Sequence, residues 1–196
     1  MQCKAFANSL TKKHNMKKTL LILSAAAIIG SAFTMAMIWK IDEKASTVKW
    51  ELPNNPGHKG TFSNLSATID FDKAKLAESK ITASIDVKTI DGGNPKLNAH
   101  LQAPDFFDAE KFPKITFTST ELRADGAGYI AKGKLQMKDS IKMIEFPFTF
   151  TENGDKAAFS GTITLNASDY GVMKKNPDPA KAGDKTIIYL DVPVNK

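Results

Sequence analysis

The chain has few of the residues on which most catalytic and nucleic-acid sites depend. Its 196 residues include one cysteine, Cys3, one arginine, Arg123, and three histidines. One thiol cannot form an internal disulfide, and without a cysteine pair or a His-x-x-x-His spacing we expect no zinc site. With a single arginine, we also expect no site that holds phosphates or base edges through paired hydrogen bonds.

Motifs for named reaction classes are missing as well. No Gly-x-Ser-x-Gly elbow is present, no glycine-rich loop leads into a long helix, and the acidic residues lack the spacing of a calcium loop. The sequence therefore predicts a protein that is not an enzyme and that holds no metal ion or other cofactor.

The first 36 residues have the composition of a targeting segment. Four lysines between residues 12 and 18 precede an uncharged apolar run over residues 20–38, with small residues towards its end. This order is typical of a secretory signal peptide over residues 1–36, so we expect a periplasmic mature chain of residues 37–196. Met16 offers a second start, which would make residues 1–15 an upstream extension. An uncleaved membrane anchor is the alternative.

Most of the net positive charge belongs to this segment. The formal net charge is +6, but five of the 27 basic residues and none of the 21 acidic residues lie in residues 1–36. The remaining chain is nearly neutral, so it has no basic footprint for nucleic acid. It also has no thiol, because Cys3 lies in the targeting segment.

Strict alternation of apolar and polar residues dominates the rest of the chain. Alternation with a period of two is typical of half-buried strands. It runs through residues 47–52, 67–71, 81–87, 115–118, 144–150, 159–165 and 188–194. Turn residues such as Asn153-Gly154 separate the runs. We expect about eight strands in an antiparallel meander that closes on itself, an all-β, eight-stranded barrel in a single domain.

Two segments interrupt this pattern. Residues 94–102 are predicted to form a short helix insertion, with Asn94 as its cap and Pro95 in its first turn. Residues 170–185 are rich in Lys, Pro, Gly and Asp, and we expect a mobile loop there.

The positive signal for function is an excess of inward-facing apolar side chains. A small barrel can fill its interior with such side chains or keep room for one ligand, and periodicity does not distinguish the two. If the interior is hollow, we expect an apolar tunnel for a ligand. Its candidate wall residues are Val48, Trp50, Phe62, Phe106, Phe117, Phe146 and Phe148.

Four polar residues are candidates for the end of such a tunnel. His58 lies between glycines and is either an exposed turn residue or a contact to a ligand head group. His100 is more readily explained as a hydrogen-bonded tie between helix and barrel. Asp169 and Tyr170 follow a strand and form either a turn with an Asx-type hydrogen bond or a polar gate.

Several motifs occur in the order found in a known family. They are residues 58–62 (HKGTF), 97–108 (LNAHLQAPDFFD), 112–119 (FPKITFTS) and 166–172 (NASDYGV). In these motifs the chain resembles the YceI-like family over nearly all of residues 37–196. The resemblance implies a lipocalin-like barrel with a long tunnel, export to the periplasm, and binding of polyprenyl phosphates, quinones or related amphiphiles. No catalytic activity is established for that family as a whole.

The chain departs from the family pattern at three places. Leu97-Asn98 stands where the family often has Arg-Asp, and Ala167 stands where it often has Arg. The glycine usual in the turn near Lys138-Asp139-Ser140 is also absent. Losing two arginines favours a neutral quinone or a fatty-acid-like amphiphile over a ligand with a phosphate head group.

Three functional hypotheses follow from these observations. The first is an exported carrier for an isoprenoid or another long-chain amphiphile, with transient membrane contact. The second is an enzyme acting on a lipid or quinone with His58 or His100 as general base. The third is a stress-response interaction module whose barrel is filled and displays the loop over residues 174–185. The sequence leaves the ligand and the oligomeric state open.

Overall fold

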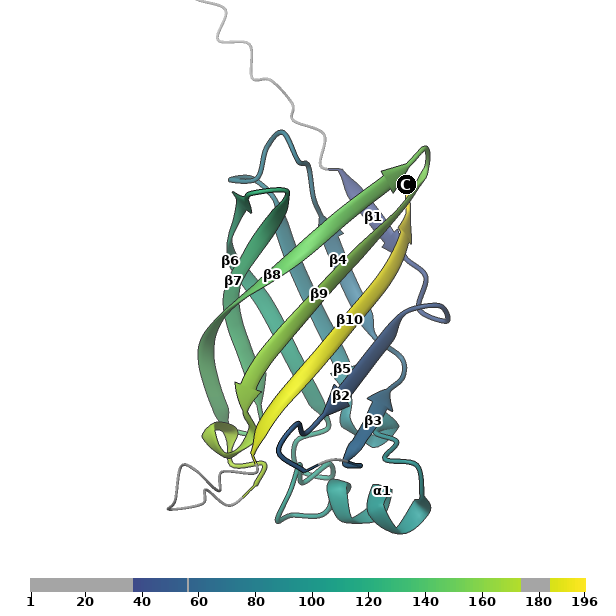
Figure 1. Cartoon of the computed structure of the whole chain (residues 1–196), viewed down its shortest axis with the longest axis vertical. Helices are drawn as coiled ribbons and strands as arrows, with labels where there is room; N and C mark the ends of the chain where they lie inside the picture. Colours follow the sequence, from purple (N-terminus) through teal and green to yellow (C-terminus); the bar gives the residue numbers. More distant parts are fainter. Residues whose placement is uncertain (1–36, 56, 174–183) are drawn as a thin grey trace, which may run out of the picture. The chain divides into compact units, whose positions relative to one another are not determined.

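The structure, a computed structural model, describes residues 37–55, 57–173 and 184–196 (Figure 1). The proposed targeting segment and residues 174–183 of the proposed loop lie outside the described residues. Within these ranges, no helix has the length and apolar content needed to cross a bilayer.

Ten strands and three short helices make up the described chain (Figure 1). In order they are β1 (Ile38–Ile41), β2 (Thr47–Glu51), β3 (Lys59–Phe62), β4 (Ser66–Asp70), β5 (Lys80–Asp86), η1 (Val87–Thr89), α1 (Pro95–Gln102), β6 (Lys114–Asp125), β7 (Gly128–Met137), β8 (Ser140–Asn153), β9 (Lys156–Asn166), η2 (Ala167–Tyr170) and β10 (Lys185–Asn195). All strand pairs are antiparallel.

The ten strands occupy eight positions around a closed barrel, as the sequence predicted. The sheet order is β1-β4-β5-β6-β7-β8-β9-β10-β2-β3, and β1 also pairs with β10. β1 and β2 both pair with β10, at successive parts of its length, so together they occupy one position. β3 and β4 pair with β2 and β1 in the same way and share a second position.

Three of these strands were not recognised from the sequence. β7 has small residues at the inward positions Ala131 and Gly133, which weakens the apolar alternation. At Gly133 a Cβ atom would lie 2.3 Å from the carbonyl oxygen of Thr118, so a side chain there is excluded by close backbone approach. β1 and β3 have only four residues each, too few for a period to show.

The predicted helix and its cap are confirmed. Asn94 accepts a hydrogen bond from the N–H of Leu97 through its side chain, and Pro95 begins the helix. The tight turns between β6 and β7 and between β8 and β9 place Gly126 and Gly154 at positive φ, which suits glycine. In Figure 1, α1 lies at the end of the barrel opposite the C-terminus.

The ladder between β8 and β9 covers only part of each strand. It joins Phe148–Asn153 to Lys156–Gly161, and the half of β8 before Phe148 pairs only with β7. Pro147 stands at this boundary, and proline has no N–H to donate to a ladder. The β8–β9 ladder is therefore confined to the part of the barrel nearer the C-terminus.

Candidate functional site

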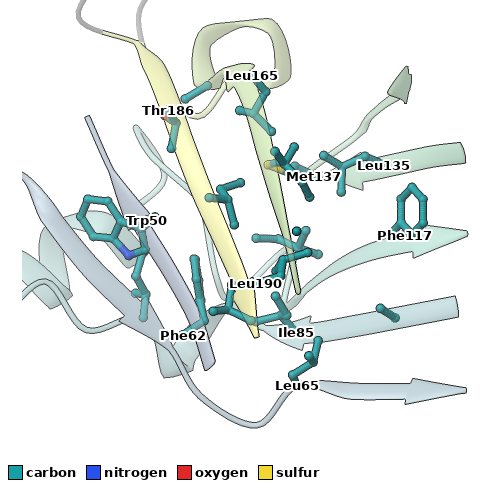
Figure 2. Close-up of a pocket in the computed structure, with 18 of the residues that line it drawn as sticks. Trp50, Phe62, Leu65, Ile85, Phe117, Leu135, Met137, Leu165, Thr186 and Leu190 are labelled. Atoms are coloured by element: carbon teal, nitrogen blue, oxygen red, sulfur yellow. The ribbon is translucent and has the colours of Figure 1, made fainter. Parts of the chain in front are cut away.

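The barrel encloses an apolar cavity of about 370 Å³ (Figure 2). Side chains from every strand between β2 and β10 line it, and Figure 2 shows several of them converging on the space, among them Trp50, Phe62 and Leu190. Binding sites for small apolar molecules commonly have this size and composition. The interior is therefore hollow over part of its length, unlike a barrel filled by its own side chains.

Small residues open the middle of the cavity. The ladders place Ala67, Ala83, Phe117 and Leu135 side by side at one level of the wall. Two adjacent alanines leave room that larger side chains on β4 and β5 would fill. Phe117 packs edge-on against Phe146, with ring centroids 5.4 Å apart, and completes this level.

The cavity wall has no Lys, Arg, Asp or Glu side chain among the described residues. Its polar lining residues are Asn55, His58, Ser84, His100, Ser160 and Thr186. Asn55 and His58 belong to the turn between β2 and β3, and His100 belongs to α1. The wall offers hydrogen bonds but no counter-charge, so an ionised group buried in it would be strongly disfavoured.

The end of the barrel farthest from α1 is filled by aromatic side chains. Phe71 is fully buried, and the ring centroids of Tyr129, Phe148, Phe150 and Phe159 lie 4.9–5.8 Å from its own. Edge-on and tilted contacts of this kind are the favoured aromatic geometries. We call Phe71, Tyr129, Phe148, Phe150 and Phe159 the aromatic plug.

The segment after α1 borders the other end of the cavity. Phe106 packs against His100, with ring centroids 4.5 Å apart, and Phe107 packs edge-on against Phe62 at 6.0 Å. Both phenylalanines line the cavity. Phe107 was missed as a site residue, because adjacent residues of an extended strand face opposite ways, whereas this segment is a turn.

We call this end of the cavity the mouth. Lys138 connects two segments of the chain there. Its Nζ donates to the carbonyl oxygens of Pro104 (3.2 Å), Phe106 (2.7 Å) and Gly171 (3.1 Å). A lysine ammonium has three donors, so all of them are occupied. Lys138 also adopts a φ of 53°, the conformation for which glycine would be favoured in this turn.

Replacing the Lys138 ammonium should destabilise the protein and increase the mobility of the mouth. We expect Lys138→Met to lower the free energy of unfolding by about 2 kcal/mol, because three hydrogen bonds from a charged donor are lost. The amide protons of residues 106–109 should then exchange faster with solvent, as measured by hydrogen–deuterium exchange. Lys142→Met is the matched control, since Lys142 makes no hydrogen bond or ion pair within the described chain. Equal exchange in both variants would contradict the tie.

α1 is held by a second set of polar contacts to residues 91–93, a segment that bridges to Thr61 of β3. Asp91 accepts hydrogen bonds from the N–H of Gly93 (2.9 Å) and from the Asn98 side chain (3.1 Å), and Asn98 in turn accepts from the N–H of Gly92 (2.7 Å). These bonds hold the pKa of Asp91 below its ordinary value, first through Gly93 and then through Asn98. Their stabilisation is present above the ordinary pKa of 3.8 and is lost as the pH falls through the lowered pKa.

Eight of the ten residues predicted for the site line the cavity. They are Val48, Trp50, His58, Phe62, Phe106, Phe117, Phe146 and Phe148. Asp169 and Tyr170 do not. Both lie in η2, where Asp169 is exposed and Tyr170 packs into the core, so the gate proposed for them is absent from the cavity lining. Burial raises the pKa of the Tyr170 hydroxyl. The turn alternative agrees with η2, a single short helical turn, although Asn166 at its start makes no side-chain cap bond.

The sequence singled out too few wall residues. Ile188, Leu190 and Val192 on β10, and Leu135 and Met137 on β7, line the cavity without having been proposed for it. The alternation in β10 was visible and could have placed its three residues on the inner face. Leu97 and Ala167, two of the departures from the family pattern, also line the cavity. Over the described ranges no three His, Cys, Asp or Glu side chains group as metal ligands would.

Comparisons with known proteins agree with this architecture. The sequence model described as the YceI-like domain matches residues 39–194. A UPF0312 protein of Vibrio cholerae is 30% identical over 171 residues, which are 81% of this chain and 90% of the relative. The crystal structure of BcnA from Burkholderia cenocepacia is similar with a TM-score of 0.72 and 28% identity, covering 79% of this chain and 99% of BcnA.

Two further solved structures share the fold. The YceI protein of Campylobacter jejuni has a TM-score of 0.63 and 27% identity, over 71% of this chain and 85% of its own. A polyisoprenoid binding domain from Saccharophagus degradans has a TM-score of 0.58 over 82% of this chain and 99% of its own. At 12% identity, that domain shows similarity of fold alone.

Proposed function

Because the chain belongs to the YceI-like domain family, we propose that it binds and carries a long apolar molecule of the isoprenoid or fatty type, with an uncharged polar head, inside its barrel. The observation that carries this proposal is the cavity wall, which is apolar apart from six polar side chains and has no Lys, Arg, Asp or Glu among the described residues.

The driving force would be removal of the ligand's chain from water. Burying roughly 400 Å² of apolar surface gains about 10 kcal/mol at 25 cal/mol per Å². Association and ordering costs are subtracted from this gain, so micromolar affinity is the expected range. The polyisoprenoid binding domain of Saccharophagus degradans supports the proposal as an analogy at the level of the fold.

The uncharged head group is proposed from the two lost arginines. Leu97 and Ala167 both line the cavity, so apolar side chains face the space where the family often places a guanidinium. The three donors of Lys138 are occupied by carbonyl oxygens, so this ammonium has no free N–H to offer a phosphate in place of the guanidinium. A phosphate at this position would lose its hydration without gaining a counter-charge.

We propose a carrier rather than an enzyme acting on the ligand. A histidine base is normally oriented by an acid or held close to a nucleophile. The imidazoles of His58 and His100 make no hydrogen bond or ion pair with any residue that the structure describes. Lipid turnover that His58→Ala abolishes while binding persists would contradict this part of the proposal.

The proposal includes export to the periplasm with residues 1–36 as a cleaved signal. N-terminal sequencing of protein recovered from the periplasmic fraction tests it. A first residue near position 37 is expected, and a chain that begins at Met16 or earlier would show an uncleaved anchor instead.

The direct test of binding uses the mature protein. Organic extraction of purified protein followed by mass spectrometry should recover a neutral lipid with a long chain. Protein stripped of lipid should bind a polyprenol, and a free concentration one hundred times the Kd should stabilise the fold by about 2.7 kcal/mol. Recovery of no lipid together with no stabilisation by polyprenols, quinones or fatty alcohols would reject the proposal.

Restoring one arginine should change the preferred head group. We expect wild-type protein to bind a polyprenol more tightly than the matching polyprenyl phosphate. In Leu97→Arg the phosphate should gain at least about tenfold relative to the alcohol, since a charge-assisted hydrogen bond contributes about 1.5–3 kcal/mol. Leu97→Met is the uncharged control. An unchanged ratio of the two dissociation constants would show that residue 97 lies away from the head group.

A further inference from the structure

The cavity ends blind on two phenylalanines. Phe148 and Phe159 line it, whereas Phe71, Tyr129 and Phe150 do not. These three rings lie behind the first two: Phe71 is 5.8 Å from Phe148 and 5.2 Å from Phe159, and Phe150 is 4.8 Å from Phe159. Phe148 and Phe159 are therefore the floor of the cavity, and the other members of the aromatic plug support that floor.

A second layer closes the barrel behind the plug. The indole N–H of Trp39 donates to the carbonyl oxygen of Phe71 (2.9 Å), and the ring of Trp39 packs edge-on against Phe150 at 5.2 Å. Lys196 lies over the same indole, 5.3 Å from the ring centroid, and pairs with Glu152 at 2.9 Å. Glu152 also pairs with Lys73 at 2.9 Å. The barrel is thus a tube with one closed end, and a tail cannot leave through it.

We propose that Phe148 and Phe159 act as a ruler that sets the length of the apolar chain that this protein binds best. The inference rests on the proposed function, and it concerns which members of the ligand class are selected. On β10 the wall extends from Thr186 to Val192, about 20 Å of strand. With the usual strand tilt this is roughly 15 Å along the barrel. A chain that fits this depth is fully covered, and the excess of a longer chain stays in water.

The ruler predicts a characteristic dependence of affinity on chain length. Each methylene moved from water to the wall should strengthen binding about fourfold. The gain should stop once the tail reaches the floor, because further methylenes have no wall to contact. An open tunnel would instead show a continued rise over the same range of lengths.

The test uses a homologous series of n-alkyl alcohols, whose head is uncharged, titrated into lipid-free mature protein by calorimetry. Phe159→Leu deepens the floor, so the plateau should move to longer chains, each newly covered methylene adding about fourfold. Ile69→Phe adds bulk at a wall residue of β4, two residues before Phe71, and should move the plateau to shorter chains. Phe117→Leu is the matched control, since it widens the middle of the cavity and leaves its depth unchanged.

The outcomes separate the ruler from the function on which it rests. Absence of binding by every alcohol and polyprenol would overturn the proposed function, and the ruler with it. Binding without a plateau, or a plateau at the same length in wild type, Phe159→Leu and Ile69→Phe, would overturn the ruler alone. Thermal unfolding identifies a variant that has failed to fold. Phe159→Leu and Ile69→Phe change the side-chain volume in opposite directions, so their packing defects differ, and either one that folds suffices for the comparison.

Discussion

Replacing Ala83 with phenylalanine should weaken binding of the ligand by about a hundredfold. Ala83 lies at the middle level of the cavity wall, between Ala67 and Phe117 in the ladders. A benzyl side chain at this point would occupy space that the ligand needs. Displacing roughly 110 Å² of ligand chain from the wall removes about 2.8 kcal/mol of burial, which corresponds to two orders of magnitude in Kd.

The matched control is the same new side chain on the opposite face of the strand. Thr82 neighbours Ala83 on β5, pairs with Thr68 and Thr118, and does not line the cavity. Thr82→Phe should therefore bind the ligand as wild type does, with Kd measured by calorimetry or by displacement of a fluorescent lipid. Retained affinity in Ala83→Phe, in protein that unfolds cooperatively, would place the ligand outside the barrel.

Removing the central ring of the aromatic plug should have the largest effect on stability. Phe71 is fully buried and touches four other rings, so Phe71→Ala should lower the free energy of unfolding by about 3–5 kcal/mol. This destabilisation has two parts: the burial of the phenyl ring is lost, and the neighbouring side chains leave a cavity that they do not fill. Urea unfolding followed by tryptophan fluorescence measures it, since Trp39 lies beside the plug and Trp50 lies in the cavity wall.

The control for this prediction is an exposed apolar residue of the same sheet. Ile141 on β8 is 60% exposed, and Ile141→Ala should change stability by no more than about 0.5 kcal/mol. A loss below about 1 kcal/mol in Phe71→Ala would mean that the plug repacks freely. A soft plug of that kind could not serve as a ruler, so this measurement also bears on the floor of the cavity.

Local patterns in the sequence were sufficient for most of the architecture. Alternation in residues 144–150 and 188–194 predicted β8 and β10, and Asn94-Pro95 predicted the start of α1, because each signal depends on neighbours in the chain. The same signals failed for β7, where Ala131 and Gly133 are small and the close approach of Thr118 leaves no room for a side chain at Gly133. They did not separate the turn from the gate at Asp169 and Tyr170, where the structure has a short helix that turns neither side chain into the cavity lining.

The amino-acid sequence by itself determined strands that each have one apolar face, because a side-chain period of two is a local property. Only the tertiary structure decided that the barrel interior is hollow at the α1 end and solid at the other. Whether the interior is filled depends on which side chains meet inside the barrel. Phe71 meets Phe148 and Phe159 and fills one end, whereas Ala67 neighbours Ala83 and leaves space. These contacts join residues that are far apart in the chain, and no local pattern in the sequence encodes them.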